Sequence, residues 1–195
     1  MKKFLIAAAA MLLSMGMFAQ SNPTLYVKAG LGFDSFTGKD VEDAKYLTGF
    51  SAVVGFEQPL TEAFVFGAEL GAQTRGMKNT YDKYTVKTVF YDMTISPFVG
   101  YHFAAGTLDI EPHVGLVASY DLSGRIKDDD DSHKIDFDDD LGDDFQRLGV
   151  AVNPGVTAWF GQFGVDLTWQ RGLLAIDKDI KGYDNQFLVR FAYRF

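Results

Sequence analysis

Apolar and polar residues alternate with a period of two along most of this chain. Near its end, Phe187, Val189 and Phe191 fall on one parity, whereas Gln186 and Arg190 fall on the other. Successive side chains of a strand point to opposite faces, so this pattern predicts a strand with one apolar and one polar face. The same pattern predicts eight strands, at residues 24–33, 49–58, 63–75, 86–103, 108–123, 146–160, 163–174 and 185–195.

The segments between these strands alternate between short and long. Short turns at one rim and long loops at the other are typical of transmembrane β-barrels. The sequence therefore predicts an all-β fold, an eight-stranded antiparallel up-and-down transmembrane β-barrel, with both termini on the short-turn, periplasmic side. The short connections are 59–62, 104–107 and 161–162, and the long ones are 34–48, 76–85, 124–145 and 175–184.

Two details of the strands can be predicted more closely. The turn at 104–107 is expected to pair Phe103 with Leu108, which joins the apolar faces of two strands. Pro97, Pro112 and Pro154 lie inside predicted strands. Proline cannot donate a hydrogen bond to the ladder, so we expect local bulges at these three positions.

The N-terminal segment has the composition of a secretory signal peptide. Lys2 and Lys3 precede an apolar stretch at 4–13 and a small-residue segment at 14–19. That stretch is too short to span a bilayer as a helix, so we expect cleavage after Ala19. The predicted organisation is a signal peptide at 1–19 and one barrel domain at 20–195.

The composition limits the partners and the chemistry that the chain can have. Its net charge of -8 disfavours nucleic acid as a partner. It has no cysteine, which excludes disulfides and thiolate chemistry. Its mean hydropathy of -0.02 is compatible with a transmembrane barrel, because half of each strand is polar.

The inward parity of the predicted strands carries many charged residues of both signs. An eight-stranded barrel has an interior only just wide enough for its side chains, so these charges should pair and plug the lumen. The alternative is a narrow channel for ions or small solutes. The predicted lumen charge network consists of Lys28, Glu57, Glu69, Arg75, Asp92, Asp109, Glu111, Asp121, Arg147, Asp166, Arg190 and Arg194.

The loop at 128–144 contains ten aspartates within seventeen residues. Such a charge run suggests a site for Ca²⁺ or Mg²⁺, although Leu141 stands where an EF-hand loop needs glycine. A solvated loop without a bound cation is the other interpretation. The candidate ligands are Asp128, Asp130, Asp136, Asp138 and Asp140.

The histidines offer a test for an enzymatic role. The expected register places His102 opposite Asp109 and His113 opposite Phe98. A His–Asp pair could act as a base, but no serine is clearly positioned as its nucleophile. We therefore expect a protein that is not an enzyme and needs no cofactor. A lipid-modifying outer-membrane enzyme is the alternative.

Two segments carry a family resemblance. The sequence GVAVNPGVTAWFGQFGVDLTWQRGLLAI at 149–176 and IEPHVGLVASY at 110–120 resemble the PorT-like outer-membrane β-barrels of Bacteroidota, which share their architecture with OmpX- and OmpW-type barrels. This resemblance implies an outer-membrane location, contact with lipid and lipopolysaccharide, and insertion by the barrel-assembly machinery. It does not imply one activity. The last strand also resembles the assembly signal of such barrels, at Phe187, Val189, Phe191, Tyr193 and Phe195.

Together these patterns predict an integral outer-membrane barrel with a plugged polar lumen. Its expected role is structural in the envelope, or surface binding through the long extracellular loops, because loops on a rigid scaffold commonly carry binding.

Overall fold

The computed structural model describes residues 23–39, 44–81, 84–128, 131–137, 145–177 and 181–195. The predicted signal peptide and the boundary at residue 19 lie outside these residues, as do Asp130, Asp138 and Asp140 of the acidic loop. The described residues include no helix capable of crossing a membrane.

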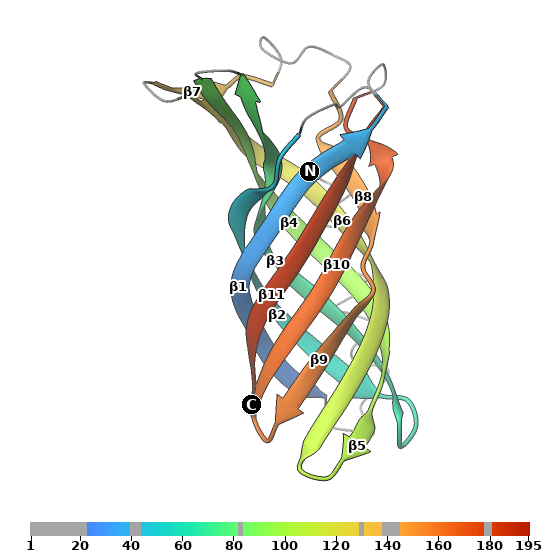
Figure 1. Ribbon diagram of the computed structural model, residues 1–195. Coiled ribbons are helices and arrows are strands. Elements are labelled where there is room, and N and C mark those ends of the chain that lie inside the picture. The colour runs from blue at the N-terminus through green and yellow to red at the C-terminus, as the bar shows by residue number, and fades with distance from the viewer. Residues whose placement is uncertain (1–22, 40–43, 82–83, 129–130, 138–144, 178–180) are drawn as a thin grey trace.

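The described chain forms a single closed sheet of antiparallel strands (Figure 1). The wall closes because β1 pairs with β11 along nearly all of its length, from Tyr26 opposite Arg194 to Gly38 opposite Gly182. The strands are β1 (Thr24–Gly38), β2 (Leu47–Pro59), β3 (Phe64–Tyr81), β4 (Tyr84–Tyr101), β5 (Phe103–Ala105), β6 (Leu108–Lys127), β7 (Ser132–Ile135), β8 (Leu148–Val152), β9 (Gly155–Phe160), β10 (Phe163–Ala175) and β11 (Gly182–Arg194).

These segments build the eight predicted wall strands. His102 separates β4 from β5, and both segments pair with β6. Residues 153–154 separate β8 from β9, and both lie between β6 and β10. The extra strand β7 pairs only with the end of β6, so it extends a hairpin beyond the wall. The predicted fold class is therefore confirmed.

The expectation of bulges at the three prolines is wrong. The register of β4 on β6 is the same on both sides of Pro97, and the register of β6 on β8 and β9 is the same through Pro112 and across Pro154. At Pro154 the ladder is interrupted without a shift, because the missing N–H removes a hydrogen bond but adds no residue. The register of the β4–β6 ladder shifts instead between Tyr91 and Asp92, where it skips Leu122 of β6.

The predicted register of the β5–β6 turn is also wrong, by two residues. Phe103 pairs with Ile110, not Leu108, because the turn consists only of residues 106–107 and begins with Gly106 at a φ of 68°. A positive φ is easily adopted by glycine and allows the tight turn. In this register Gly100 pairs with His113, and His102 lies level with Glu111. A shift of two preserves the parity, so each side chain stays on its predicted face.

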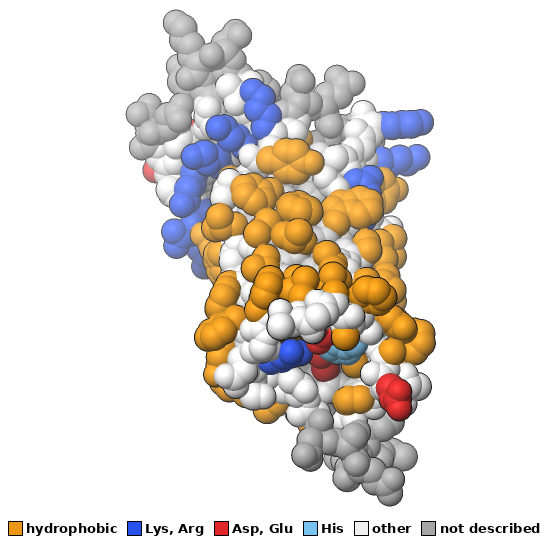
Figure 2. Space-filling model, turned by 60° about the horizontal axis from the view of Figure 1, so that its bottom comes forward, with side chains coloured by type: hydrophobic (Ala, Val, Ile, Leu, Met, Phe, Trp, Pro, Cys, Tyr) orange, Lys and Arg blue, Asp and Glu red, His pale blue; other side chains and the backbone are white. Residues whose placement is uncertain are grey.

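Burial follows the alternation of faces. Along β10 every second residue from Gly164 to Gly172 is buried, whereas Val165, Leu167 and Trp169 are exposed. Figure 2 shows apolar side chains covering the flank of the molecule, and basic, acidic and histidine side chains inside the hollow at the short-turn rim. The apolar surface thus faces outward, and the core is the polar interior of the barrel.

Candidate functional site in the barrel lumen

A balanced set of four charged residues lies in the half of the lumen nearer the short turns, and we call it the quartet. Lys28 Nζ lies 2.9 Å from Glu69 Oε1 and 3.1 Å from Asp166 Oδ2. Arg190 lies 3.3 Å from Glu69 Oε2 and 2.7 Å from Asp166 Oδ1. Each cation therefore contacts both anions, and all four side chains are buried.

Neutral side chains complete the hydrogen bonding of the quartet. The Tyr26 hydroxyl donates to Glu69 over 3.1 Å, and the hydroxyls of Thr157 and Thr168 donate to Asp166 over 2.9 and 3.0 Å. A buried ion pair is tolerated only when its remaining polar atoms are satisfied in this way. The quartet thus fills its level of the lumen with charged groups that are paired with one another and hydrogen-bonded to neutral neighbours.

A second charge cluster lies toward the long-loop end, and we call it the Arg75 cluster. Arg75 lies 2.8 Å from Asp121 and 3.1 Å from Asp92, and all three side chains are almost inaccessible. Two further buried carboxylates, Asp34 and Asp184, lie within electrostatic reach of Arg75. Asp34 accepts a hydrogen bond from the Gly76 amide over 2.6 Å.

Asp34 and Asp184 are lumen residues that the sequence analysis assigned to loops. Both strands run further than predicted, to Gly38 in β1 and from Gly182 in β11. The signal was present, because Asp34 continues the inward parity of Lys28, and Asp184 continues that of Arg190. Extending the period-two pattern into the polar flanks would have found them.

Uncharged side chains fill the space around these clusters. Tyr26, Phe98 and Trp159 pack with Ala192 inside the barrel, and the Tyr26 and Trp159 rings meet edge to face at 6.1 Å. The buried amides of Gln73 and Gln170 meet across the lumen at 3.2 Å. The interior is therefore packed with side chains, as expected for an eight-stranded barrel.

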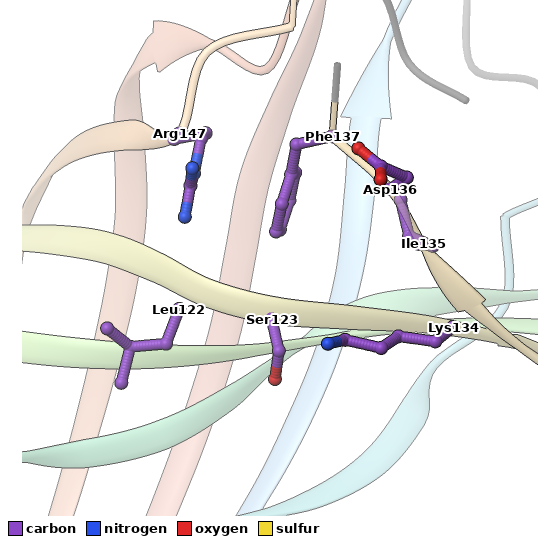
Figure 3. Close-up of a pocket in the computed structure, with 7 residues that line it drawn as sticks. All are labelled: Leu122, Ser123, Lys134, Ile135, Asp136, Phe137 and Arg147. Atoms are coloured by element: carbon purple, nitrogen blue, oxygen red, sulfur yellow. The ribbon is translucent and has the colours of Figure 1, made fainter. Parts of the chain in front are cut away.

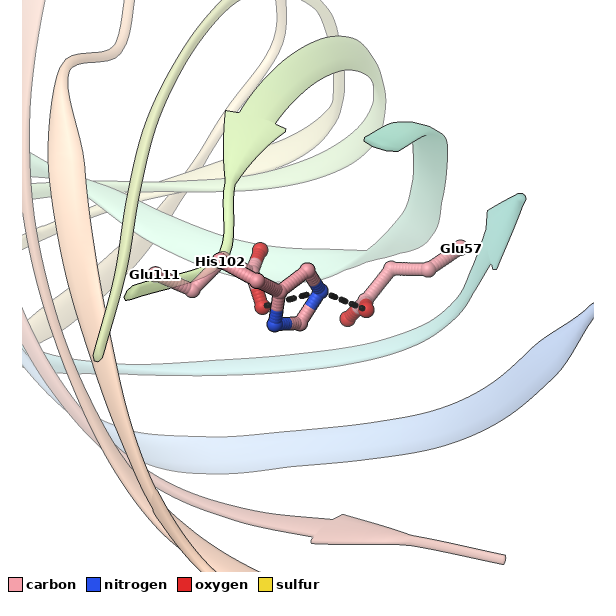
Figure 4. A group of neighbouring side chains, drawn as sticks. All are labelled: Glu57, His102 and Glu111. Carbon is pink, nitrogen blue, oxygen red and sulfur yellow. Dashed lines mark ion pairs between the residues drawn. The ribbon is translucent and has the colours of Figure 1, made fainter. Parts of the chain in front are cut away.

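A third group lies at the short-turn rim, and we call it the mouth cluster: Glu57, His102, Asp109, Glu111 and Arg194. His102 Nδ1 lies 2.8 Å from Asp109 Oδ2, while Nε2 lies 3.4 Å from Glu57 Oε2 and 4.0 Å from Glu111 Oε2 (Figure 4). The predicted contact between His102 and Asp109 thus forms, although Asp109 is not directly opposite. Arg194 also contacts Asp109, at 3.3 Å.

Arg147, the last member of the predicted network, lies apart from these clusters. Its guanidinium donates to the backbone oxygen of Asp121 and stacks over the rings of Tyr120 and Phe137. It lines a cavity of about 270 Å³ where the β6–β7 hairpin leaves the wall (Figure 3). The other lining residues are Leu122, Ser123, Lys134, Ile135, Asp136 and Phe137.

The described members of the acidic loop lie in two different places. Asp128 caps the turn between β6 and β7, where its carboxylate accepts a hydrogen bond from the Asp131 amide over 2.6 Å. Asp136 follows β7 and lines the cavity. The proposed assembly residues of the last strand point outward: Phe187, Val189, Phe191 and Phe195 are exposed, and Tyr193 is partly buried against Phe163.

The closed wall, the apolar outer surface and the paired interior charges define the class of protein. Only a closed sheet leaves no unpaired strand edge in hydrocarbon, so this is a transmembrane β-barrel. The sequence matches the family described as outer membrane protein beta-barrel domain over residues 5–195. The chain belongs to this family, and its location is the outer membrane.

The chain is also similar to solved structures, and the first of those named here supports the same fold. Neisserial surface protein A is 12% identical, with a TM-score of 0.58, and the alignment covers 90% of this chain and 100% of that protein. Ail, the attachment invasion locus protein of Yersinia pestis, is 10% identical over 90% of this chain and 100% of its own, with a TM-score of 0.48. The outer membrane enzyme PagL is 10% identical over 86% and 98%, with a TM-score of 0.49. Among curated proteins no sequence matches the chain.

Proposed function

We propose that this chain is a non-enzymatic outer-membrane barrel with a plugged lumen that acts at the cell surface or supports the envelope. The observation that supports this is the filled interior, where the quartet and the Gln73–Gln170 pair occupy successive levels. Ions in transit would have to displace buried, mutually paired charges, which costs several kcal/mol per uncompensated ion.

Surface binding is the activity that the outer end favours. Long loops are extracellular in such barrels, which places the β6–β7 hairpin and its cavity outside the membrane. Arg147 and Lys134 provide cationic groups there, and Phe137 provides a planar apolar surface. Loops on a rigid scaffold are common binding surfaces.

The same proposal includes the subfamily to which the chain belongs and the partners that it contacts. Within its family, the segments at 110–120 and 149–176 favour kinship with the PorT-like barrels of Bacteroidota. The apolar outer face supports contact with outer-membrane lipid and lipopolysaccharide, and the barrel wall supports insertion by the barrel-assembly machinery as part of this proposal. A removed signal peptide at 1–19 would deliver the chain to the periplasm.

Conductance across planar bilayers tests the plugged lumen. The chain at 20–195 is refolded, its folding is verified by heat-modifiable migration on a gel, and current is recorded. We expect no discrete steps. Reproducible unitary currents would refute the plug and support the alternative, a narrow channel. Changed lipid A mass spectra on expression would instead support the lipid-modifying enzyme.

The surface role needs a separate test. Cells displaying the chain are compared with cells displaying a variant in which residues 128–145 are replaced by a short Gly-Ser turn, and retention on protein-coated and bare surfaces is measured. We expect retention to fall while the barrel still folds. Equal retention would exclude adhesion through this hairpin and leave the envelope role. Calorimetry with Ca²⁺ and Mg²⁺ tests the cation hypothesis for the acidic loop.

A further inference from the structure

The mouth cluster places three metal-ligating side chains together in space. Glu57 comes from β2, His102 from the break between β4 and β5, and Glu111 from β6. One ligand atom from each residue lies within 4.8 Å of the other two. Figure 4 shows both carboxylates pointing toward the ring of His102. We propose that Glu57, His102 and Glu111 bind a divalent transition-metal ion such as Zn²⁺ at the periplasmic mouth of the barrel.

The distances suit such an ion. Zn²⁺ bonds nitrogen and oxygen donors at about 2.0–2.2 Å, so a tetrahedral site sets its donors roughly 3.4 Å apart. The Nε2 atom of His102 lies 3.4 Å from Glu57 Oε2 and 4.0 Å from Glu111 Oε2. All three donor atoms lie within 4.8 Å of one another, so they must draw closer to reach the tetrahedral spacing. An imidazole with two carboxylates suits Zn²⁺ and related first-row ions better than Ca²⁺, which takes six to eight oxygen ligands.

The histidine is oriented as a metal ligand should be. His102 Nδ1 lies 2.8 Å from Asp109 Oδ2, and a carboxylate accepts, so Nδ1 donates its proton. In the neutral ring this leaves the lone pair on Nε2, the atom that faces both glutamates. A carboxylate that holds the second nitrogen of a ligating histidine is a recurrent support of metal sites.

An unsatisfied atom points to a missing ligand. Glu111 is 0% exposed, and its Oε1 has no hydrogen-bond partner among the described residues, although Oε2 accepts from the indole of Trp159 over 2.9 Å. Glu57 is also buried. Two buried carboxylates thus face one histidine, and a bound dication would offset their negative charge.

The site is also accessible. The side chain of His102 is 23% exposed, and Figure 2 shows histidine and acidic side chains in the hollow at the short-turn rim. An ion and its remaining water ligand could enter from the periplasm without passing the aromatic layer of Tyr26, Phe98 and Trp159. The proposed site is thus separate from the surface role of the opposite rim, and either can fail without the other.

Zinc calorimetry on the untagged, refolded and chelator-treated barrel tests the proposal. We expect one Zn²⁺ per barrel. Glu111→Gln and His102→Ala should weaken binding at least about tenfold, and Asp109→Asn, which acts through His102, about 10–100-fold. Two matched controls should bind as the wild type does: Glu62→Gln, an exposed acid of the turn at the same rim, and His133→Ala on β7 at the opposite end.

A measurement on the unaltered chain covers variants that fail to fold. Zn²⁺ should protect His102 from acylation by diethylpyrocarbonate, read by peptide mass spectrometry, while His133 stays reactive. Absence of zinc binding by a verifiably folded barrel would overturn the proposal. So would zinc binding that survives both His102→Ala and Glu111→Gln, or that protects His133 instead of His102.

Discussion

The quartet and the Arg75 cluster both compensate charges that are buried in the lumen, but they do so in different ways. In the quartet, two cations and two anions each have two partners, so the charges balance locally. In the Arg75 cluster a single guanidinium faces Asp92 and Asp121 at contact distance, with Asp34 and Asp184 nearby. The difference indicates that the cost of removing one charged side chain depends on whether another residue still contacts its partners. The number of ion pairs alone does not determine this cost.

The largest effect is expected for Arg75→Met. Its removal leaves Asp92 and Asp121 buried without their cation, and breaking a buried ion pair in this way costs about 3–5 kcal/mol. The free energy of unfolding in lipid vesicles, from urea titration, measures the loss. Arg125→Met, which alters an exposed arginine of β6, is the matched control and should change stability little. A loss below that of Lys28→Met would contradict the comparison.

A smaller loss is expected for Lys28→Met. Arg190 still contacts both Glu69 and Asp166, so the remaining imbalance is one charge, and the loss should lie near the lower end of that range, about 3 kcal/mol. The same urea titration measures it, with Lys87→Met on the exposed face of β4 as control. Equal losses for Arg75→Met and Lys28→Met would show that redundancy gives no protection.

The double variant Lys28→Met with Glu69→Gln tests whether the charges of the quartet are energetically coupled. It leaves Arg190 paired with Asp166 and restores neutrality, so it should be more stable than the sum of the single losses predicts. The coupling should be about 0.5–3 kcal/mol, as found for residues within one network. A double-mutant cycle from the same unfolding curves gives this value, and strictly additive losses would show that the quartet is not a unit.

Among the single variants, the smallest loss is expected for Trp159→Phe, at the border between the quartet and the mouth cluster. It removes the indole donor to Glu111 and leaves that buried oxygen unsatisfied, which costs about 1–3 kcal/mol. Trp169→Phe is the control, because its indole bonds to Asn185 in an exposed position. Since each variant removes one of the two tryptophans, unfolding is followed by circular dichroism. Similar losses in the two variants would mean that burial of Glu111 carries no penalty.

The fold could be predicted because a period of two, repeated over eight segments, allows few other structures. Parity also placed Lys28, Glu69, Asp166 and Arg190 correctly on the inner face. The hydrophobic pattern does not predict the tilt of the strands relative to the barrel axis. This tilt determines which strands bring their side chains together across the lumen. Glu57 therefore reaches His102 from β2, a contact that no local spacing reveals.

The errors have local causes. The β5–β6 turn was placed two residues off because Gly106 permits a two-residue turn that hydrophobicity alone does not indicate. The strand β7 was missed because Ser132–Ile135 is short and lies within the acidic run, where charge predicts a solvated loop. Arg147 was assigned to the lumen by parity, but it precedes β8 and contacts aromatic rings instead of a carboxylate partner.

The seam between β1 and β11 has a consequence for how the protein folds. Lys28 on β1 contacts Asp166, 138 residues away, and Arg190 on β11 contacts Glu69, 121 residues away. These contacts close only when the first and last wall strands meet, so the loop-closure entropy must be lost before the ionic interactions form. An open sheet keeps the Asp166–Arg190 pair of the neighbouring strands β10 and β11 but breaks the Lys28–Asp166 and Arg190–Glu69 contacts, whereas a closed sheet forms all of them together. Closure should therefore be cooperative and late, and a barrel that has closed should reopen slowly.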